Sequence, residues 1–171
     1  MRSNIHRING PWTGQLAILA RPRGNDWLMD EIQGWRNAGI DVVVSLLTTP
    51  ENIEFGLTDE GRIVLSQGLK FVSFPIADYG VPKSEESVLR LTNELYRLLS
   101  SGKCVGIHCR QGIGRSGLIA ASLLVAAGQQ PAEAFEHVEL GRGASVPDTA
   151  DQRTWVFGLA MNLKSAQYRS R

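Results

Sequence analysis

Apolar and polar positions along the chain change their period several times. Four short runs are apolar or alternate from residue to residue, which is typical of β-strands: residues 16–20, 41–47, 71–75 and 103–108. The run at 41–47 (DVVVSLL) is apolar enough for a strand buried on both faces of a sheet. Pro75 should end the third run, because proline cannot donate a hydrogen bond to a neighbouring strand.

Stretches with apolar residues at helical spacing separate these runs and predict helices. Residues 51–65 predict a short helix and a turn around Gly61, and Gly39 should end the first long helix. Three tryptophans, Trp27, Trp35 and Trp155, fall on helical stripes and are expected in the core. The helices are expected to begin at Asp26, Ser84, about Arg115, Pro131, and Asp148 or Thr149. This alternation predicts an α/β fold, with a central, mostly parallel sheet flanked by helices on both faces.

The composition is that of one globular domain, residues 1–171. Hydrophobic residues make up 43 % of the chain and charged residues 20 %, which argues against a disordered protein. The 18 Lys and Arg against 17 Asp and Glu leave a formal net charge of +1. This near-neutral balance excludes a generally basic nucleic-acid-binding protein, so we expect no nucleic-acid partner.

We expect a cytoplasmic protein without membrane contact. The longest apolar stretch, residues 117–128, is too short to span a bilayer, and residues 1–12 lack the apolar region of a signal peptide. Cys104 and Cys109 are the only two cysteines, too few for a disulfide scaffold or a four-cysteine zinc site. A reducing compartment is therefore the simplest setting, and no metal or other cofactor is expected.

The stretch with the most chemical content, residues 108–116 (HCRQGIGRS), joins a predicted strand to a predicted helix. Gly112 and Gly114 allow positive φ, which aims successive backbone N–H groups inward. Such a loop at a helix N-terminus binds anions, because the free N–H groups and the helix dipole both favour negative charge. Arg115 adds a planar guanidinium that can hold two oxygens of a tetrahedral oxyanion. The expected phosphate-binding residues are Arg110, Gln111, Gly112, Ile113, Gly114 and Arg115.

Cys109 lies in the positive field of this loop, which favours its thiolate. A thiolate beneath a phosphate-sized anion site is a nucleophile directed at phosphorus. Cys104 lies five residues earlier on the same predicted strand. That separation is about 16 Å, whereas the Cα atoms of a disulfide lie roughly 4.4–6.8 Å apart. Cys104 is therefore expected to be a packing residue.

Residues 108–116 resemble the signature of the cysteine-based protein tyrosine and dual-specificity phosphatases: Cys, five residues, then Arg, with His before and Ser after. Residues 74–78 (FPIAD) resemble that family's mobile general-acid loop, with Asp78 placed 31 residues before Cys109. Residues 146–152 (VPDTADQ) are similar to its glutamine-bearing segment. The likeness covers nearly the whole chain, and compact enzymes of the kinase-associated phosphatase type are most similar.

The resemblance implies a phosphomonoesterase that acts on phosphotyrosine in proteins through a phosphocysteine intermediate, with phosphoserine and phosphothreonine left open. Cys109 would attack phosphorus, Arg115 would hold the phosphoryl oxygens, and Asp78 would donate the proton to the leaving group. Ser116 would donate a hydrogen bond to the sulfur, and Gln152 would position the hydrolytic water.

Several of these residues have a simpler alternative role. Asp78 before Tyr79 and Gly80 is also a common turn residue, and Gln152 could be an exposed helical side chain. His108 is expected to orient the loop through its ring hydrogen bonds. Arg110 in the loop, and Arg21 and Arg23 at the cleft rim, could each lie near the substrate or simply be solvated. Weaker candidates for the general acid are Asp59, Asp148 and Asp151.

Two other functions share the loop. A pseudophosphatase would hold phosphorylated partners without hydrolysis, but nucleophile, arginine and acid candidate are all present. A rhodanese-like domain would catalyse sulfur or arsenate chemistry with a similar Cys-to-Arg loop. The Gly-x-Gly-Arg-Ser sequence and Asp78 argue against this alternative. The expected partner is a phosphorylated protein, phosphoinositides remain open as substrates, and a monomer is favoured.

Overall fold

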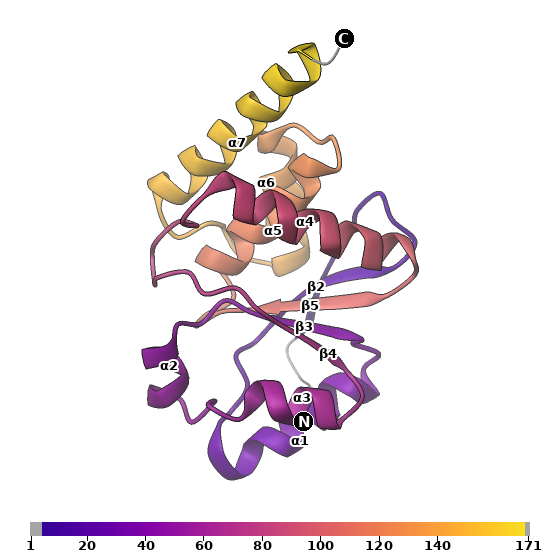
Figure 1. Cartoon of the computed structure of the whole chain (residues 1–171), viewed down its shortest axis with the longest axis vertical. Coiled ribbons are helices and arrows are strands. Elements are labelled where there is room, and N and C mark those ends of the chain that lie inside the picture. The colour runs from indigo at the N-terminus through magenta and orange to yellow at the C-terminus, as the bar shows by residue number, and fades with distance from the viewer. Residues whose placement is uncertain (1–4, 170–171) are drawn as a thin grey trace.

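The computed structural model describes residues 5–169. Its centre is a five-stranded sheet with the order β1-β2-β5-β3-β4 (Figure 1). Strand β1 pairs antiparallel with β2, and the remaining neighbours are parallel, so the expected mostly parallel sheet is confirmed. The strands are β1 (Ile5–Ile8), β2 (Gln15–Leu19), β3 (Val42–Ser45), β4 (Lys70–Ser73) and β5 (Cys104–His108).

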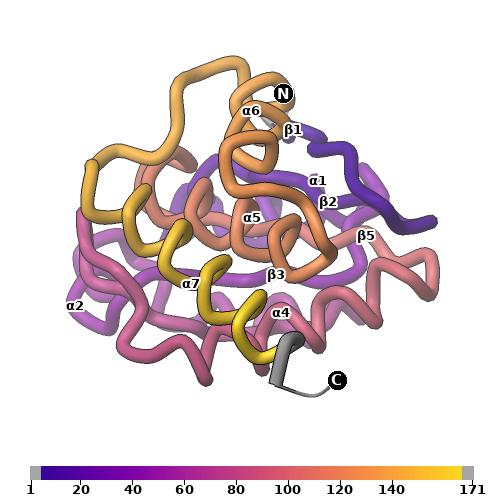
Figure 2. Tube along the Cα trace, turned by 90° about the horizontal axis from the view of Figure 1, so that it is seen from above, coloured from indigo at the N-terminus to yellow at the C-terminus, as the bar shows by residue number. Residues whose placement is uncertain are grey.

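Helices cover both faces of the sheet, as the sequence predicts. Figures 1 and 2 show α4 to α7 packed on one face and α1 to α3 on the other. On the first face lie α4 (Glu85–Ser100), α5 (Gly114–Ala126), α6 (Pro131–Arg142) and α7 (Ala150–Arg169). On the second lie the 3₁₀ turn η1 (Asn25–Trp27), α1 (Leu28–Asn37), α2 (Thr49–Glu54) and α3 (Glu60–Ser66). No helix in residues 5–169 is both long and apolar enough to cross a membrane.

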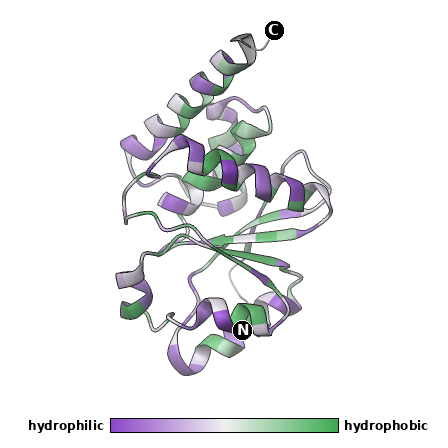
Figure 3. Ribbon diagram, viewed as in Figure 1, coloured by the Kyte–Doolittle hydropathy of each residue, from purple (hydrophilic) through white to green (hydrophobic). Residues whose placement is uncertain are grey.

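The core forms two layers, one on each face of the sheet. Helix α5 is buried along nearly its whole length, which confirms the buried helix expected over residues 117–128. Apolar colour fills α5 and the strands in Figure 3, whereas polar colour marks the outer surfaces of the surrounding helices. The helix that carries the Gly-rich loop is thus held firmly against the sheet, which limits movement of the loop's C-terminal end.

The structure corrects several local predictions. β1 was missed because its four residues (IHRI) include two polar side chains, so the predicted first strand is in fact the second. Asp26 lies inside η1, and the helix that follows has no side-chain cap. The turn predicted around Gly61 lies at Gly56 instead, where φ is +66°. Gly61 is inside α3. Trp27 is 52 % exposed and lies outside the core.

Other predicted helix ends are confirmed. The Ser84 hydroxyl accepts a hydrogen bond from the Ser87 N–H at 3.2 Å and caps α4. The Thr149 hydroxyl accepts one from the Gln152 N–H at 3.1 Å at the start of α7. Pro131 begins α6, where its missing N–H costs nothing.

Candidate active site

The Gly-rich loop lies at the carboxyl edge of the sheet, between β5 and α5, where parallel α/β sheets place their ligands. Gly112 has φ +67°, as predicted, and a Cβ there would approach Ile18 Cγ2 at 3.1 Å and the Leu19 carbonyl oxygen at 3.3 Å. Arg142 of α6 donates hydrogen bonds to the carbonyl oxygens of Gln111 and Gly112, at 3.3 and 2.8 Å. Its guanidinium therefore fixes the outward side of the loop.

Gly114 does not have the expected positive φ, because it is already the first residue of α5. Glycine is required there by close approach instead: a Cβ would collide with the carboxylate of Asp148. That carboxylate accepts a hydrogen bond from the Gly114 N–H. Burial and the charge of Asp78 raise the pKa of Asp148, and the contacts with Gly114 and Arg115 offset part of this rise.

Cys109 lies directly after β5 and is 2 % exposed. Its sulfur accepts a hydrogen bond from the Gly112 N–H at 3.3 Å. The Ser116 hydroxyl, in the first turn of α5, is buried and has no hydrogen-bond partner among the described residues. An unsatisfied buried hydroxyl of this kind costs about 1–3 kcal/mol.

A second cysteine has the same spacing to an arginine, because five residues also separate Cys104 from Arg110. Cys104 is the first residue of β5, and Arg110 lies just beyond the last one, so an extended strand rather than a loop separates the two residues. Burial raises the pKa of the Cys104 thiol, with a smaller opposing effect from Arg7. Both cysteines are free thiols, and only Cys109 lies within the Gly-rich loop.

Arg115 is 1 % exposed and is surrounded by acceptors. Its two terminal nitrogens donate to the two carboxylate oxygens of Glu51, each at 2.8 Å. One of them also donates to the Ile76 carbonyl at 2.9 Å, and the other to Asp78 Oδ1 at 2.9 Å. Arg115 thus joins the loop, α2 and the Asp78 segment at one point.

Glu51 is the residue of this site that the sequence analysis missed. Burial alone would raise its pKa, but hydrogen bonds from Arg115 and Thr48 outweigh that effect and lower the pKa to about 2. Glu51 also completes a capping box with Thr48 at the start of α2. The pattern Thr-x-x-Glu ahead of a short helix was therefore the available signal.

Asp78 occupies the turn that its sequence context suggested, and its carboxylate also reaches Arg115. Its Oδ1 accepts the Tyr79 N–H at 3.1 Å, as a turn aspartate does, and also contacts Arg115. Tyr79 has φ +58°, which is uncommon for a residue other than glycine and shows a tight turn. The turn places the Asp78 carboxylate over the Gly-rich loop.

Gln152 is fully buried, which rules out the exposed helical side chain considered above. Its amide nitrogen donates to the Gly80 carbonyl at 3.0 Å, and its oxygen accepts the N–H groups of Asp148 and Thr149 at 3.1 and 3.3 Å. Gln152 therefore ties the segment before α7 to the Asp78 turn.

His108 pairs with a residue of α3 that the sequence did not indicate. Its Nε2 lies 2.7 Å from Glu60 Oε1, and both side chains are almost completely buried. The ring also contacts Trp35, with centroids 5.7 Å apart. This arrangement fixes the end of β5, one residue before Cys109.

The three arginines near the rim have different surroundings. Arg21 and Arg110 both lie over the ring of Phe55, at 3.6 and 5.0 Å from its centroid. Arg23 instead lies over Trp27 and forms an ion pair with Glu31 at 2.6 Å. Of the two arginines named from the sequence ARPRG, Arg21 thus shares the Phe55 ring with Arg110 of the Gly-rich loop.

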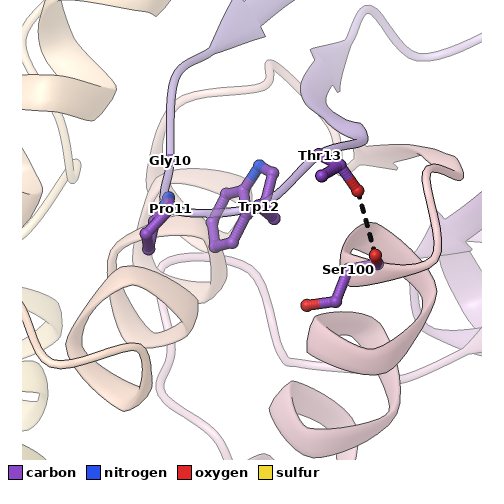
Figure 4. A pocket seen from close by; sticks show the side chains of 5 residues that line it. All are labelled: Gly10, Pro11, Trp12, Thr13 and Ser100. Atoms are coloured by element: carbon purple, nitrogen blue, oxygen red, sulfur yellow. Dashed lines mark hydrogen bonds between the residues drawn. The ribbon is translucent and has the colours of Figure 1, made fainter.

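The described residues also form hollows outside this site. A shallow hollow of about 460 Å³ lies at the amino end of β2 (Figure 4). There the Thr13 hydroxyl donates to the Ser100 carbonyl at 2.9 Å, and no lining side chain is titratable. The residues that line it are Gly10, Pro11, Trp12, Thr13 and Ser100. Within residues 5–169 no three His, Cys, Asp or Glu side chains converge as metal ligands would.

Comparison with known families decides what this site belongs to. Residues 18–129 match the family model described as "Polymorphic toxin system, DSP-PTPase phosphatase". The chain belongs to this DSP-PTPase phosphatase family. The matched residues include the Gly-rich loop, the Asp78 turn and Glu51, so the residues gathered around Arg115 lie within the part that defines the family.

Two curated relatives of this chain are much longer proteins that it matches over a small part of their length. The protein tyrosine phosphatase domain-containing protein 1 of Bos taurus is 30 % identical over 127 residues, 68 % of this chain and 16 % of the relative. That of Mus musculus is 29 % identical over 141 residues, 75 % of this chain and 18 % of the relative. The chain therefore spans less than a fifth of either protein.

Solved structures extend the likeness to the complete fold. A kinase associated phosphatase, with serine in place of its catalytic-site cysteine, superposes with a TM-score of 0.87 at 21 % identity, over 96 % of this chain and 97 % of that one. Tk-PTP in its active form gives a TM-score of 0.71 at 25 % identity, over 92 % and 96 %. The predicted resemblance to compact phosphatases is confirmed.

Proposed function

We propose that the chain is a cysteine-dependent phosphomonoesterase that removes phosphate from phosphotyrosine, and from phosphoserine or phosphothreonine where these reach the thiol. One observation carries the proposal: buried Arg115, oriented by Glu51, reaches Asp78 from the same loop in which the Gly112 N–H contacts the Cys109 sulfur. Nucleophile, oxyanion-binding group and proton donor are thereby within one small site.

In the first half-reaction the Cys109 thiolate attacks phosphorus in line with the ester oxygen. A sulfur–phosphorus bond forms, the phosphorus–oxygen ester bond breaks, and the leaving oxygen takes a proton from the Asp78 carboxyl group. The Arg115 guanidinium and the loop N–H groups hold the phosphoryl oxygens, where charge builds up. General acid catalysis of this kind accelerates such a step by roughly 10² to 10⁴.

In the second half-reaction water attacks the phosphocysteine. Asp78, now ionised, accepts the water proton, the sulfur–phosphorus bond breaks, and inorganic phosphate leaves. The unpartnered Ser116 hydroxyl donates to the departing sulfur, which supports its role as a thiolate stabiliser. Gln152, anchored beside the Asp78 turn, is the side chain we assign to water positioning.

The test is hydrolysis of p-nitrophenyl phosphate by the purified chain. We expect turnover without added metal, unaffected by chelator and blocked by vanadate. Cys109→Ser should abolish turnover while phosphate still binds, and Asp78→Asn should lower kcat most for poor leaving groups. Cys104→Ser is the matched control, because Cys104 lies at the far end of β5, and it should retain activity. Wild-type turnover in Cys109→Ser would disprove the assignment of the nucleophile.

The setting of the reaction follows from the nucleophile. A thiolate must stay reduced to attack phosphorus, which supports a cytoplasmic location. The proposed substrate is a phosphorylated protein, and we propose that the domain acts as a monomer.

A further inference from the structure

Two arginines on different elements share one aromatic ring beside the Gly-rich loop. Arg21 and Arg110 each follow the carboxyl end of a strand by two residues, and these strands, β2 and β5, are parallel neighbours. Phe55 follows α2, the helix that supplies Glu51. Three chain segments thus bring two guanidiniums to the rim of the site.

The position of Arg21 is fixed by packing. Its guanidinium lies 3.6 Å from the Phe55 ring centroid, and its Nε is buried with no hydrogen-bond partner among the described residues. The loop that carries it is held by the Asn25 N–H, which donates to the Gly56 carbonyl at 2.9 Å. An oriented guanidinium loses less conformational freedom when it binds an anion than a solvated one does.

The charge of this cluster is incompletely balanced. Arg110 lies 3.4 Å from Glu54 and 3.8 Å from Asp78, in contacts exposed to solvent. Burial, and next the charge of Arg110, lower the pKa of Arg21, which shows that the two cations repel each other there. Arg110 thus has two carboxylates beside it, whereas no carboxylate of the described residues forms an ion pair with Arg21, whose guanidinium is left to complement a single anionic group.

We infer that Arg21, with Arg110 and Phe55, forms a subsite for an acidic side chain of the phosphoprotein substrate, next to the phosphorylated residue. The inference rests on the proposed phosphatase activity and adds a substrate class to it. Aspartate, glutamate or a second phosphorylated residue would each present the oxyanion that a guanidinium fork binds with two hydrogen bonds. One guanidinium without an ion pair suits such a side chain better than a polyanionic lipid headgroup.

The experiment compares phosphotyrosine peptides that differ only beside the phosphotyrosine. One set places glutamate at each neighbouring position in turn, a second places phosphoserine there, and a third places glutamine. Wild type should prefer the best acidic peptide over its glutamine counterpart by about tenfold in kcat/KM, the size expected of a charge-assisted contact at a partly exposed site. The separate glutamate and phosphoserine arms show which oxyanion is preferred.

Arg21→Met should reduce this preference to near unity. The preference is a ratio within each variant, so a general loss of folding or rate cancels. Arg23→Met is the matched control, since Arg23 lies on the same loop but pairs with Glu31, and it should keep the preference. A tenfold preference that survives in Arg21→Met, or none in an active wild type, overturns the inference.

Failure of the phosphatase proposal would look different, because wild type would then hydrolyse neither p-nitrophenyl phosphate nor any peptide. A phosphoinositide in micelles supplies the last arm. Faster hydrolysis of that lipid than of every peptide, with loss of the lipid activity alone in Arg21→Met, would also overturn the inference, because the subsite would then serve a headgroup.

Discussion

The ion pair between Glu51 and Arg115 should make a large contribution to the free energy of unfolding. Substituting Glu51→Gln keeps the size of the side chain but removes the charge that faces buried Arg115. Both side chains lie almost entirely out of solvent, at 9 % and 1 % exposure. Removing one partner of such a buried pair leaves an uncompensated charge and typically costs 3–5 kcal/mol.

The pKa of Glu51 gives an independent magnitude. It is lowered from 4.5 to about 2 in the folded protein. At 1.36 kcal/mol for each pH unit between these values, the charged form contributes roughly 3 kcal/mol to the free energy of unfolding at pH 7. For a chain of this length that corresponds to a fall in Tm of about 6–12 °C.

The pH dependence has a definite sign. A carboxyl group with a lowered folded pKa stabilises the fold above its unfolded pKa, and this stabilisation is lost as the pH falls through the folded value. The difference between wild type and Glu51→Gln should therefore be constant above about pH 5. It should shrink below pH 4.5 and vanish near pH 2.

Urea denaturation of both proteins between pH 3 and pH 7 measures this difference. Glu86→Gln is the matched control, because Glu86 pairs with Arg90 at the surface, with 77 % and 73 % exposure. That variant should lose no more than about 0.5 kcal/mol. A Glu51→Gln protein within 0.5 kcal/mol of wild type at pH 7, or a difference that stays constant down to pH 3, would refute the reasoning.

Three further substitutions probe the loop and the residues that support it. Gly112→Ala should lower stability by about 1–2 kcal/mol and slow turnover, because φ is +67° there. Gly158→Ala in α7 is the control and should be neutral or stabilising, because it has open space around it; thermal melts and p-nitrophenyl phosphate rates compare the two variants. Glu60→Gln should cost about 1–3 kcal/mol and lower kcat, because a neutral amide replaces the carboxylate that faces buried His108; unchanged denaturation and rate would show that this charge is dispensable. Asp148→Asn should tighten inhibition by inorganic phosphate at neutral pH, because it removes a carboxylate from the Gly114 N–H; equal or weaker inhibition would contradict that.

Much of this fold could be predicted because its strands and helices carry strong local patterns. Five of the seven residues in the run 41–47 are apolar, and Ser84 has both the right residue type and the right position for a cap. β1 escaped because its pattern is mixed and its pairing with β2 is an edge contact. Trp27 escaped because a 3₁₀ turn, with Asn25 at φ +52°, shifts the stripe that an unbroken helix would have buried.

The residues of the candidate site also fall into those that a local sequence pattern predicts and those that it does not. Cys109, Gly112 and Arg115 lie within seven consecutive residues, so their spacing predicts that they share one loop. Glu51 and Glu60 lie 64 and 48 residues from their partners, and no local pattern can report such contacts. The role of a buried carboxylate can be identified only from the three-dimensional structure, which shows the group that it pairs with.

The contacts of Arg115 also divide the site into a fixed and an exchangeable part. Glu51 and the Ile76 carbonyl hold the guanidinium whatever occupies the loop. Asp78 at Arg115 and Asp148 at Gly114 instead occupy donors that a phosphoryl group would use. Under the proposed mechanism, one phosphate carries enough oxygens to replace both carboxylates, and Asp78 displaced in this way should lie beside the leaving oxygen. Because Gln152 bonds both the Gly80 carbonyl and the Asp148 N–H, the two displacements should occur together, so that binding phosphate and positioning the acid become one event.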